Sequence, residues 1–143
     1  MNGEPGAGGV ARDLRVAAVA VDLPADPSAP ASARSALEPL RDALPADEFV
    51  DVRLLVSELV VDELRAPREG AATIHLAASL DAGLLRIELV EGWTPGADPP
   101  VRPHPGDPGW GVYLAQLLGD RWGTEPVAAR TRIWVEKRID AGA

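Results

Sequence analysis

DEFVDVRLLVSELVVDELRA, the stretch Asp47–Ala66, is the strongest helical pattern in the sequence. Asp47 can cap the start of such a helix, and Pro67 ends it. On a helical wheel at about 100° per residue, its charged positions gather in a stripe roughly 60° wide, and apolar residues fill most of the remaining circumference. The positions in the stripe are Asp51, Glu58, Asp62 and Arg65. The pattern predicts a mostly buried helix whose narrow charged strip faces a cavity.

Two carboxylates on this strip, Glu58 and Asp62, lie one helical turn apart with no basic residue between them. Like charges at this spacing destabilise a helix by about 0.2–0.5 kcal/mol. A divalent cation would relieve the repulsion, and one carboxylate would suit general-base chemistry. The alternative is a solvated acidic strip that Arg65 partly neutralises. Both interpretations stay open on the helical wheel alone.

The chain before this helix divides into short segments. Met1–Arg12 is rich in glycine and is expected to be a disordered lead-in. Leu14–Val21 is short and apolar, which predicts an edge strand, and the proline-rich stretch Asp22–Ala31 predicts a loop. Ser32–Leu44 has apolar residues at helical spacing, so we expect a helix capped by Ser32.

The chain after the long helix predicts a hairpin, a long loop, a short helix and two closing strands. The expected segments are Ala72–Ser79, Leu84–Glu91 with the turn Asp81–Gly83, the loop Gly92–Gly109, the helix Trp110–Leu118, and the strands Arg121–Thr124 and Arg130–Ile139. Strands and helices do not alternate as in doubly wound folds. The order predicts a two-layer α+β sandwich, a mixed β-sheet with helices on one face, in one domain over residues 13–140 followed by a tail at 141–143.

Composition excludes several classes of protein. The 143 residues suit one domain, and the net charge of −8 argues against binding to duplex nucleic acid or to anionic lipid. The absence of cysteine excludes a disulfide scaffold, a thiolate zinc site and a cysteine nucleophile. His75 and His104 lie too far apart in sequence to suggest a metal site. No apolar run approaches a membrane span and no signal peptide is visible, so a cytoplasmic protein is expected.

Gly109 and Gly111 stand at the start of the predicted short helix. Glycines there let backbone N–H groups approach an anion, which the helix dipole also favours. The preceding loop, residues 92–109, has the length and the Gly and Pro content of a lid over a ligand. The alternatives are an ordinary turn and a disordered surface insertion.

Three segments in this order resemble the motifs of one family. SELVVD at Ser57–Asp62 is similar to the N-box of GHKL ATPases, and GWGVYL at Gly109–Leu114 is similar to their second glycine box. LGDRWG at Leu118–Gly123, followed by TRIWV at Thr131–Val135, resembles their closing strands. The chain looks most like the anti-sigma-factor serine kinases among them, in particular the short regulatory ATPase-domain proteins of actinobacteria. The resemblance implies the histidine-kinase-like ATPase (Bergerat) fold, with ATP or ADP and Mg²⁺ as cofactors.

The resemblance also assigns roles to individual residues. Glu58 would be the general base, and Asp62 stands where the family has the asparagine that helps to hold magnesium. Asp62 can ligate magnesium, but its negative charge beside a triphosphate should weaken nucleotide binding. Gly109 and Gly111 would bind phosphate, and Thr131 would support the residue that recognises adenine.

The first glycine box departs most from the family pattern. Where the family has DxGxG, this chain reads LVEGWTPG over Leu89–Gly96. Glu91 stands at the position of the adenine-binding Asp, and Gly96 comes one residue late. Trp93 stands where a small residue would admit adenine, so it either blocks the purine or stacks on it. The resemblance therefore covers the fold better than it covers the nucleotide site.

Three functions remain in competition at this stage. An enzyme would bind a sigma factor and use ATP to phosphorylate a serine of an anti-anti-sigma protein of the STAS type. A binding module would exchange the same partners without phosphotransfer. A structural domain with accidental motif fragments is the third, which the aligned charges of Asp47–Ala66 disfavour. Family members commonly form dimers, so a homodimer is also expected.

Overall fold

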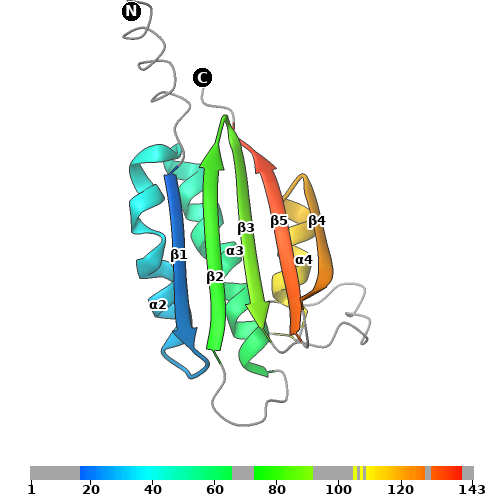
Figure 1. Cartoon of the computed structure of the whole chain (residues 1–143). Helices are drawn as coiled ribbons and strands as arrows, with labels where there is room; N and C mark the ends of the chain where they lie inside the picture. Colours follow the sequence, from blue (N-terminus) through cyan, green and yellow to red (C-terminus); the bar gives the residue numbers. More distant parts are fainter. Residues whose placement is uncertain are drawn as a thin grey trace, which may run out of the picture.

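The computed structural model describes residues 17–65, 73–91, 105, 107, 109–127 and 130–139. In these segments five strands form one sheet in the order β1-β2-β3-β5-β4. The strands are β1 (Ala17–Pro24), β2 (Thr73–Asp81), β3 (Leu84–Glu91), β4 (Arg121–Val127) and β5 (Arg130–Arg138). The helices are α2 (Ala29–Ala36), the 3₁₀ helix η1 (Glu38–Ala43), α3 (Ala46–Arg65) and α4 (Trp110–Leu118). Figure 1 shows the helices on one face of the sheet, which confirms the two-layer α+β sandwich.

The strand pairings in the described segments are antiparallel throughout, so the sheet is not the mixed one expected from the element order. The reason is the hairpin of β4 and β5. Because β4 is the outer strand of that hairpin, β5 lies next to β3 and runs against it. The β2–β3 hairpin turns at Ala82 and Gly83, whose positive φ values of 53° and 80° fit a two-residue turn of the primed kind.

The core lies between the sheet and the helices. Alternate side chains of β2 are buried on the helical side, as the period of a strand requires. They pack with the buried face of α3, and the largest fully buried side chains include Phe49, Leu37, Leu40, Ile74, Leu76 and Leu89. Burial of each such side chain contributes roughly 1.5–3 kcal/mol, so this interface is the main source of stability.

The long helix of the sequence is α3, and its expected bounds are confirmed to within one residue. It begins at Ala46, so Asp47 lies in its first turn and is not the N-cap. The carboxylate of Asp47 still favours the positive end of the helix dipole. None of the helices in the described segments is long and apolar enough to span a membrane.

The helix expected over Ser32–Leu44 is two separate elements, and that prediction was wrong in its start and its continuity. α2 begins at Ala29, after Ser28, whose N–H and hydroxyl both donate to the carboxylate of Asp26. Pro30 is tolerated because it lies in the first turn, where N–H groups have no partner in the helix. Pro39 has no N–H to continue an α-helix, and the chain passes into the 3₁₀ helix η1 there.

β1 confirms the expected edge strand, although it runs to Pro24 into the segment expected to be a loop. The face of the sheet away from the helices is polar in its β3–β5–β4 part. There Arg86 pairs with Glu88 and Glu136, and its guanidinium lies 4.9 Å from the ring centroid of Trp134. Such a surface does not need a second layer of helices to cover it.

Candidate functional site

The candidate site lies at the end of the molecule where α3 finishes and α4 begins. In Figure 1 this is the lower end, where β3 also finishes and β5 begins. The fold thus brings together segments that are 47 to 49 residues apart in the chain, as the charged strip of the long helix predicts. Their meeting depends on how closely α4 approaches α3.

Glycine allows that approach. A Cβ atom on Gly111 would lie 2.8 Å from the carbonyl oxygen of Glu58 and 2.8 Å from backbone atoms of Leu59. No real side chain is tolerated at such distances from a helix backbone. Gly109 is the N-cap of α4 with a φ of 87°, a conformation that favours glycine, and it offers no side chain to cap the helix. The two glycines therefore serve packing and turn geometry in this structure.

Asp62 supplies the missing cap from the neighbouring helix. Its Oδ2 accepts a hydrogen bond from the N–H of Gly111 at 2.8 Å, and its Oδ1 accepts one from the N–H of Gly109 at 3.2 Å. These two backbone groups, called here the N–H pair of α4, lie where a helix N-terminus binds an anion. The carboxylate of Asp62 thus takes the anion position at the N-terminus of α4.

Burial raises the pKa of Asp62 above its ordinary value of 3.8, and the hydrogen bonds from Gly111 and Gly109 and the charge of Arg65 lower it. Burial is the largest of these effects. The carboxylate is therefore partly desolvated, and the N–H pair of α4 supplies two hydrogen bonds in place of water. A desolvated acid with two such donors is a satisfied group rather than an open ligand position.

Glu58, the expected general base, lies one turn before Asp62 and is half-buried. Within the described segments its carboxylate has no hydrogen bond or ion pair, whereas its carbonyl packs against Gly111. The expectation that Glu58 and Asp62 share the neighbourhood of Gly109 fits this backbone arrangement. The proposed catalytic role of Glu58 stays a prediction.

The other expected site residues lie partly outside the described part of the chain. Thr131 is buried on β5, and it pairs in register with Glu91 at the end of β3. This pairing fits the support that the resemblance implies for Thr131. Gly96, Trp93 and most of the loop 92–109 lie outside the described residues, as does the side chain of Glu91.

Among the described residues there is no group of three or more Asp, Glu, His or Cys side chains placed to hold a metal. Asp62 commits both of its carboxylate oxygens to N–H donors. The metal role that the resemblance implies for Asp62 stays a prediction, and the contacts favour a capping role instead.

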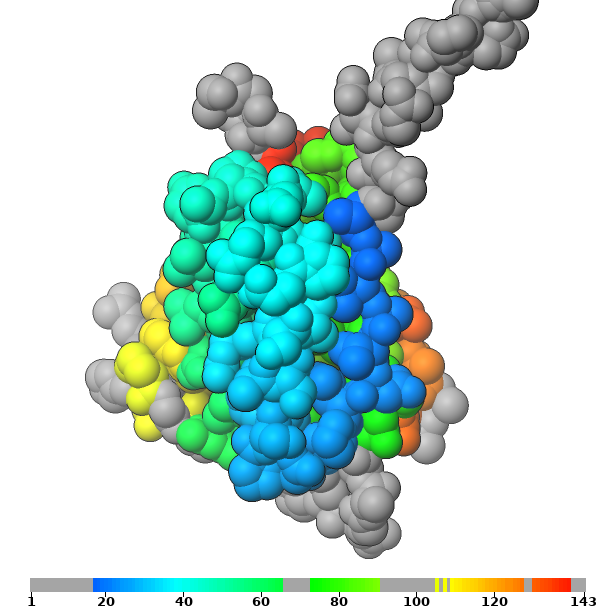
Figure 2. Space-filling model, turned by 90° about the vertical axis from the view of Figure 1, so that its left-hand side faces the viewer, coloured from blue at the N-terminus to red at the C-terminus, as the bar shows by residue number. Residues whose placement is uncertain are grey.

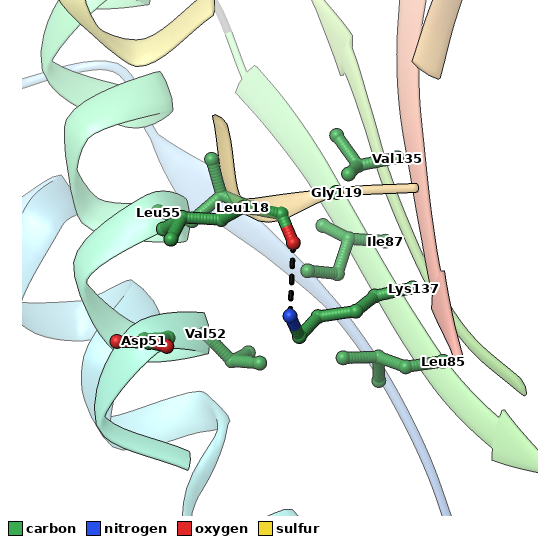
Figure 3. A pocket seen from close by; sticks show the side chains of 9 residues that line it. All are labelled: Asp51, Val52, Leu55, Leu85, Ile87, Leu118, Gly119, Val135 and Lys137. Carbon is green, nitrogen blue, oxygen red and sulfur yellow. Dashed lines mark hydrogen bonds between the residues drawn. The ribbon is translucent and has the colours of Figure 1, made fainter. Parts of the chain in front are cut away.

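The C-terminus of α4 contacts a positive charge, in contrast to the carboxylate of Asp62 at its N-terminus. Lys137 on β5 donates from Nζ to the carbonyl oxygen of Leu118 at 3.0 Å, and its Nζ lies 3.3 Å from Oε1 of Glu48 on α3. Figure 3 shows this lysine in a narrow hollow between α3, the sheet and the end of α4. A cation at the C-terminus of a helix and an anion at its N-terminus both favour the helix dipole.

The Asp62 cap was missed by sequence reasoning, which treated the glycines and the acids as a shared site for an external ligand. The available signal was complementarity: a helix start with no capping side chain of its own, and an acid on the helix expected beside it.

Comparison with solved structures finds a neighbour that matches over most of the chain. It is described as the RsbU and RsbW domains of Rv1364c from Mycobacterium tuberculosis, with a TM-score of 0.68 and 20% sequence identity. The two chains share a fold. The match covers 88% of this chain and 33% of the neighbour, so the chain spans about a third of that protein. The shared fold agrees with the α+β sandwich expected from the order of the elements. No family model matches the sequence, and no curated protein matches it.

Proposed function

We propose that this chain is a regulatory domain of the anti-sigma-factor type that acts by binding and exchanging protein partners, with its phosphate position closed by its own Asp62. The observation that carries the proposal is the pair of hydrogen bonds from Gly109 and Gly111 to that carboxylate. An anionic ligand would need to displace Asp62 from the N–H pair of α4 before it could use those donors.

Electrostatics makes that displacement unfavourable. A phosphate that enters beside Asp62 meets a like charge at short range, whereas the asparagine of the family would be neutral. The departures at Glu91 and Trp93 add to this, because they alter the expected adenine position. Weak or absent nucleotide binding follows from these features together.

The partners proposed are a sigma factor and a STAS-type anti-anti-sigma protein. The support for them is the RsbW-like fold, together with the N-box and second glycine box in the family order. The same resemblance supports a homodimer. Sedimentation analysis of the purified chain would test that assembly separately.

Calorimetric titration with Mg-ATP and Mg-ADP tests the closed site. We expect a Kd weaker than about 1 mM, which corresponds to a binding free energy of about −4 kcal/mol. Binding in the low micromolar range by the wild-type chain would contradict the proposal. A parallel assay with a STAS-type protein and ATP labelled at the γ-phosphate would detect phosphotransfer.

An ATP-dependent serine kinase is the second candidate. It is favoured by the glycines at the start of α4 and by the register pairing of Thr131 with Glu91. In this case Glu58 would accept the proton of the substrate serine hydroxyl. Phosphotransfer by the wild-type chain that is lost in Glu58→Gln would establish the kinase and reject the closed site.

A further inference from the structure

β1 is an edge strand whose outer side is unprotected. In the described part of the chain it lies at the end of the sheet order and pairs with β2 alone. A free edge presents a row of unpaired N–H and C=O groups, so natural sheets usually protect it with charged residues, proline or a covering segment. From Ala17 to Val21 the strand contains only alanine and valine. Figure 2 shows the dark-blue surface of β1 uncovered beside the helical layer for most of its length.

The opposite edge of the sheet, formed by β4, has those protective features. Pro126 lies in that strand, and its charged side chains form ion pairs with the neighbouring strand β5. Glu125 pairs with Arg132, and Nη1 of the exposed Arg121 lies 3.8 Å from Oε1 of Glu136. The two edges of this sheet therefore differ in how far they are protected against an added strand.

The register shows which backbone groups of β1 face outward. A two-residue turn joins β2 and β3, so the residues that flank it, Asp81 and Leu84, exchange both backbone hydrogen bonds. Alternate residues of an antiparallel strand bond to opposite neighbours, so the even-numbered residues of β2 bond to β1. Their partners are the odd-numbered residues of β1. The N–H and C=O groups that point away from the sheet therefore belong to Ala18, Ala20 and Asp22.

The side chains of β1 agree with this orientation. Pro24, which has no N–H, is also an even-numbered residue, so the pairing with β2 loses no hydrogen bond there. Ala18 and Ala20 are small and exposed, so they do not obstruct a strand that approaches the edge. Val19 and Val21 are half-buried and pack against the core on the helical side. An added strand would therefore meet apolar side chains on its helical side and small ones on its open side.

We propose that β1 binds an extended segment of a partner protein by strand addition. The segment pairs with the outward N–H and C=O groups of β1, and its valine or isoleucine residues lie beside Val19 and Val21 on the helical side. Backbone pairing supplies the affinity, and the alternate apolar positions supply the specificity. The inference goes beyond the proposed function, because strand addition does not require Asp62 to close the site.

A second copy of this chain fits the edge poorly. α2 contacts β1 and lies along its outer side in Figure 1. Symmetric antiparallel pairing through β1 would place both copies of α2 on the same face of the joined sheet. Neighbouring strands lie about 4.8 Å apart, whereas packed helices need about 8–10 Å between their axes, so the two helices would collide. Residues 1–12 also fit poorly, because they include four glycines and a proline, which are rare in strands.

Two synthetic peptides test the edge. One is about nine residues long, alternates valine with threonine and has a lysine at each end, and the other has the same sequence with proline at its central position. Fluorescence anisotropy should show at least about tenfold tighter binding of the first peptide. In the wild-type chain, the first peptide should slow hydrogen exchange at Ala18, Ala20 and Asp22 and leave exchange in β4 unchanged.

Two variants of one residue place the contact. Ala20→Pro removes an outward N–H without breaking the pairing of β1 with β2, and it should weaken the first peptide about tenfold or more. Ala20→Val is the matched control, because it keeps the N–H and favours a strand, and it should bind as the wild type does. Thermal melts show whether both variants keep the fold. Hydrogen exchange in the wild-type chain decides the question if the proline variant is unstable.

The inference would be overturned by equal binding of the two peptides, by exchange that does not slow at the outward amides of β1, by slower exchange in β4 instead, or by a folded Ala20→Pro variant that binds like the wild type. Dimerisation that slows exchange at the same amides without peptide would show that a second copy occupies the edge instead. Tighter peptide binding after deletion of residues 1–12 would show that this segment occupies it. Nucleotide titration of Ala20→Pro should match the wild type, so failure of the closed-site proposal can be told apart from failure of this one.

Discussion

Replacing Asp62 by asparagine removes its charge and keeps its shape. The amide oxygen of asparagine can accept one N–H of the α4 pair, whereas the amide nitrogen is a donor and cannot accept the other. The variant therefore weakens the cap on α4 and frees one of the Gly109 and Gly111 donors for a ligand. It also restores the residue that the resembled family has at this position.

The expected gain in nucleotide affinity follows from the removed repulsion. Two unit charges about 4 Å apart interact by about 4 kcal/mol at an effective dielectric of about 20. Asp62 is half-buried, so solvent and a bound magnesium ion reduce this strongly. We expect a realised gain of about 1–2 kcal/mol, which is roughly a five- to thirtyfold decrease in the Kd for Mg-ATP.

Calorimetry with Mg-ATP on the wild type and on Asp62→Asn measures this change. Asp51→Asn is the matched control, because it removes one carboxylate from the same helix near the other end of α4. The control should leave nucleotide affinity unchanged. Weaker binding by Asp62→Asn would mean that the carboxylate ligates magnesium, and unchanged binding would mean that it does not compete with phosphate. Either result would refute the closed site.

Four further predictions concern stability and the adenine position. Gly111→Ala should lower the unfolding free energy by about 1–3 kcal/mol, measured by urea denaturation, because the new Cβ meets the α3 backbone at 2.8 Å. Lys137→Met should lower the unfolding free energy by about 1–3 kcal/mol in the same assay, because it removes the cation that pairs with Glu48 and with the carbonyl oxygen of Leu118. An unchanged unfolding free energy would show that these contacts do not contribute to stability. Burial raises the pKa of Asp62, so its protonated form stabilises the fold below about pH 3.8, and this stabilisation is lost as the pH rises through the folded-state pKa. The melting temperature of Asp62→Asn should therefore rise relative to that of the wild type between acid and neutral pH. A difference in melting temperature that does not change with pH would contradict this. Trp93→Gly, made together with Asp62→Asn, should raise the affinity for ATP and leave inorganic triphosphate unchanged, whereas a loss of about 1–3 kcal/mol would show that Trp93 stacks on the base.

Hydrophobic periodicity and turn residues were enough to predict most of the helices and strands. The charged strip and apolar circumference of Asp47–Ala66 placed α3 correctly, and Asp81–Gly83 placed the β2–β3 hairpin. The start of the helix expected over Ser32–Leu44 was misplaced because Pro30 was interpreted as part of a loop. Proline is tolerated in the first turn of a helix, where N–H groups have no partner in the helix. The antiparallel sheet could not be read from element order, since it depends on which strand of the last hairpin lies against β3.

The candidate site was predictable in its residues but not in its contacts. The spacing of Glu58 and Asp62 showed that they share one side of α3, and the glycines marked the start of α4. Sequence patterns do not show which polar groups form hydrogen bonds with each other across two helices, because that depends on how closely the helices pack. The cap from Asp62 to Gly109 and Gly111 is such a contact across two helices.

Lys137 is the only lysine in the sequence, so its ammonium is the only side-chain amine available to amine-selective reagents. It is held between Glu48 and the last carbonyl of α4, and less than a quarter of its side chain is exposed at 23%. A reagent that acylates amines would therefore react slowly while α4 is packed against the sheet, and faster when that helix moves away. The rate of acylation at this one position would therefore report whether α4 moves when a partner protein is added, with no label introduced by mutation.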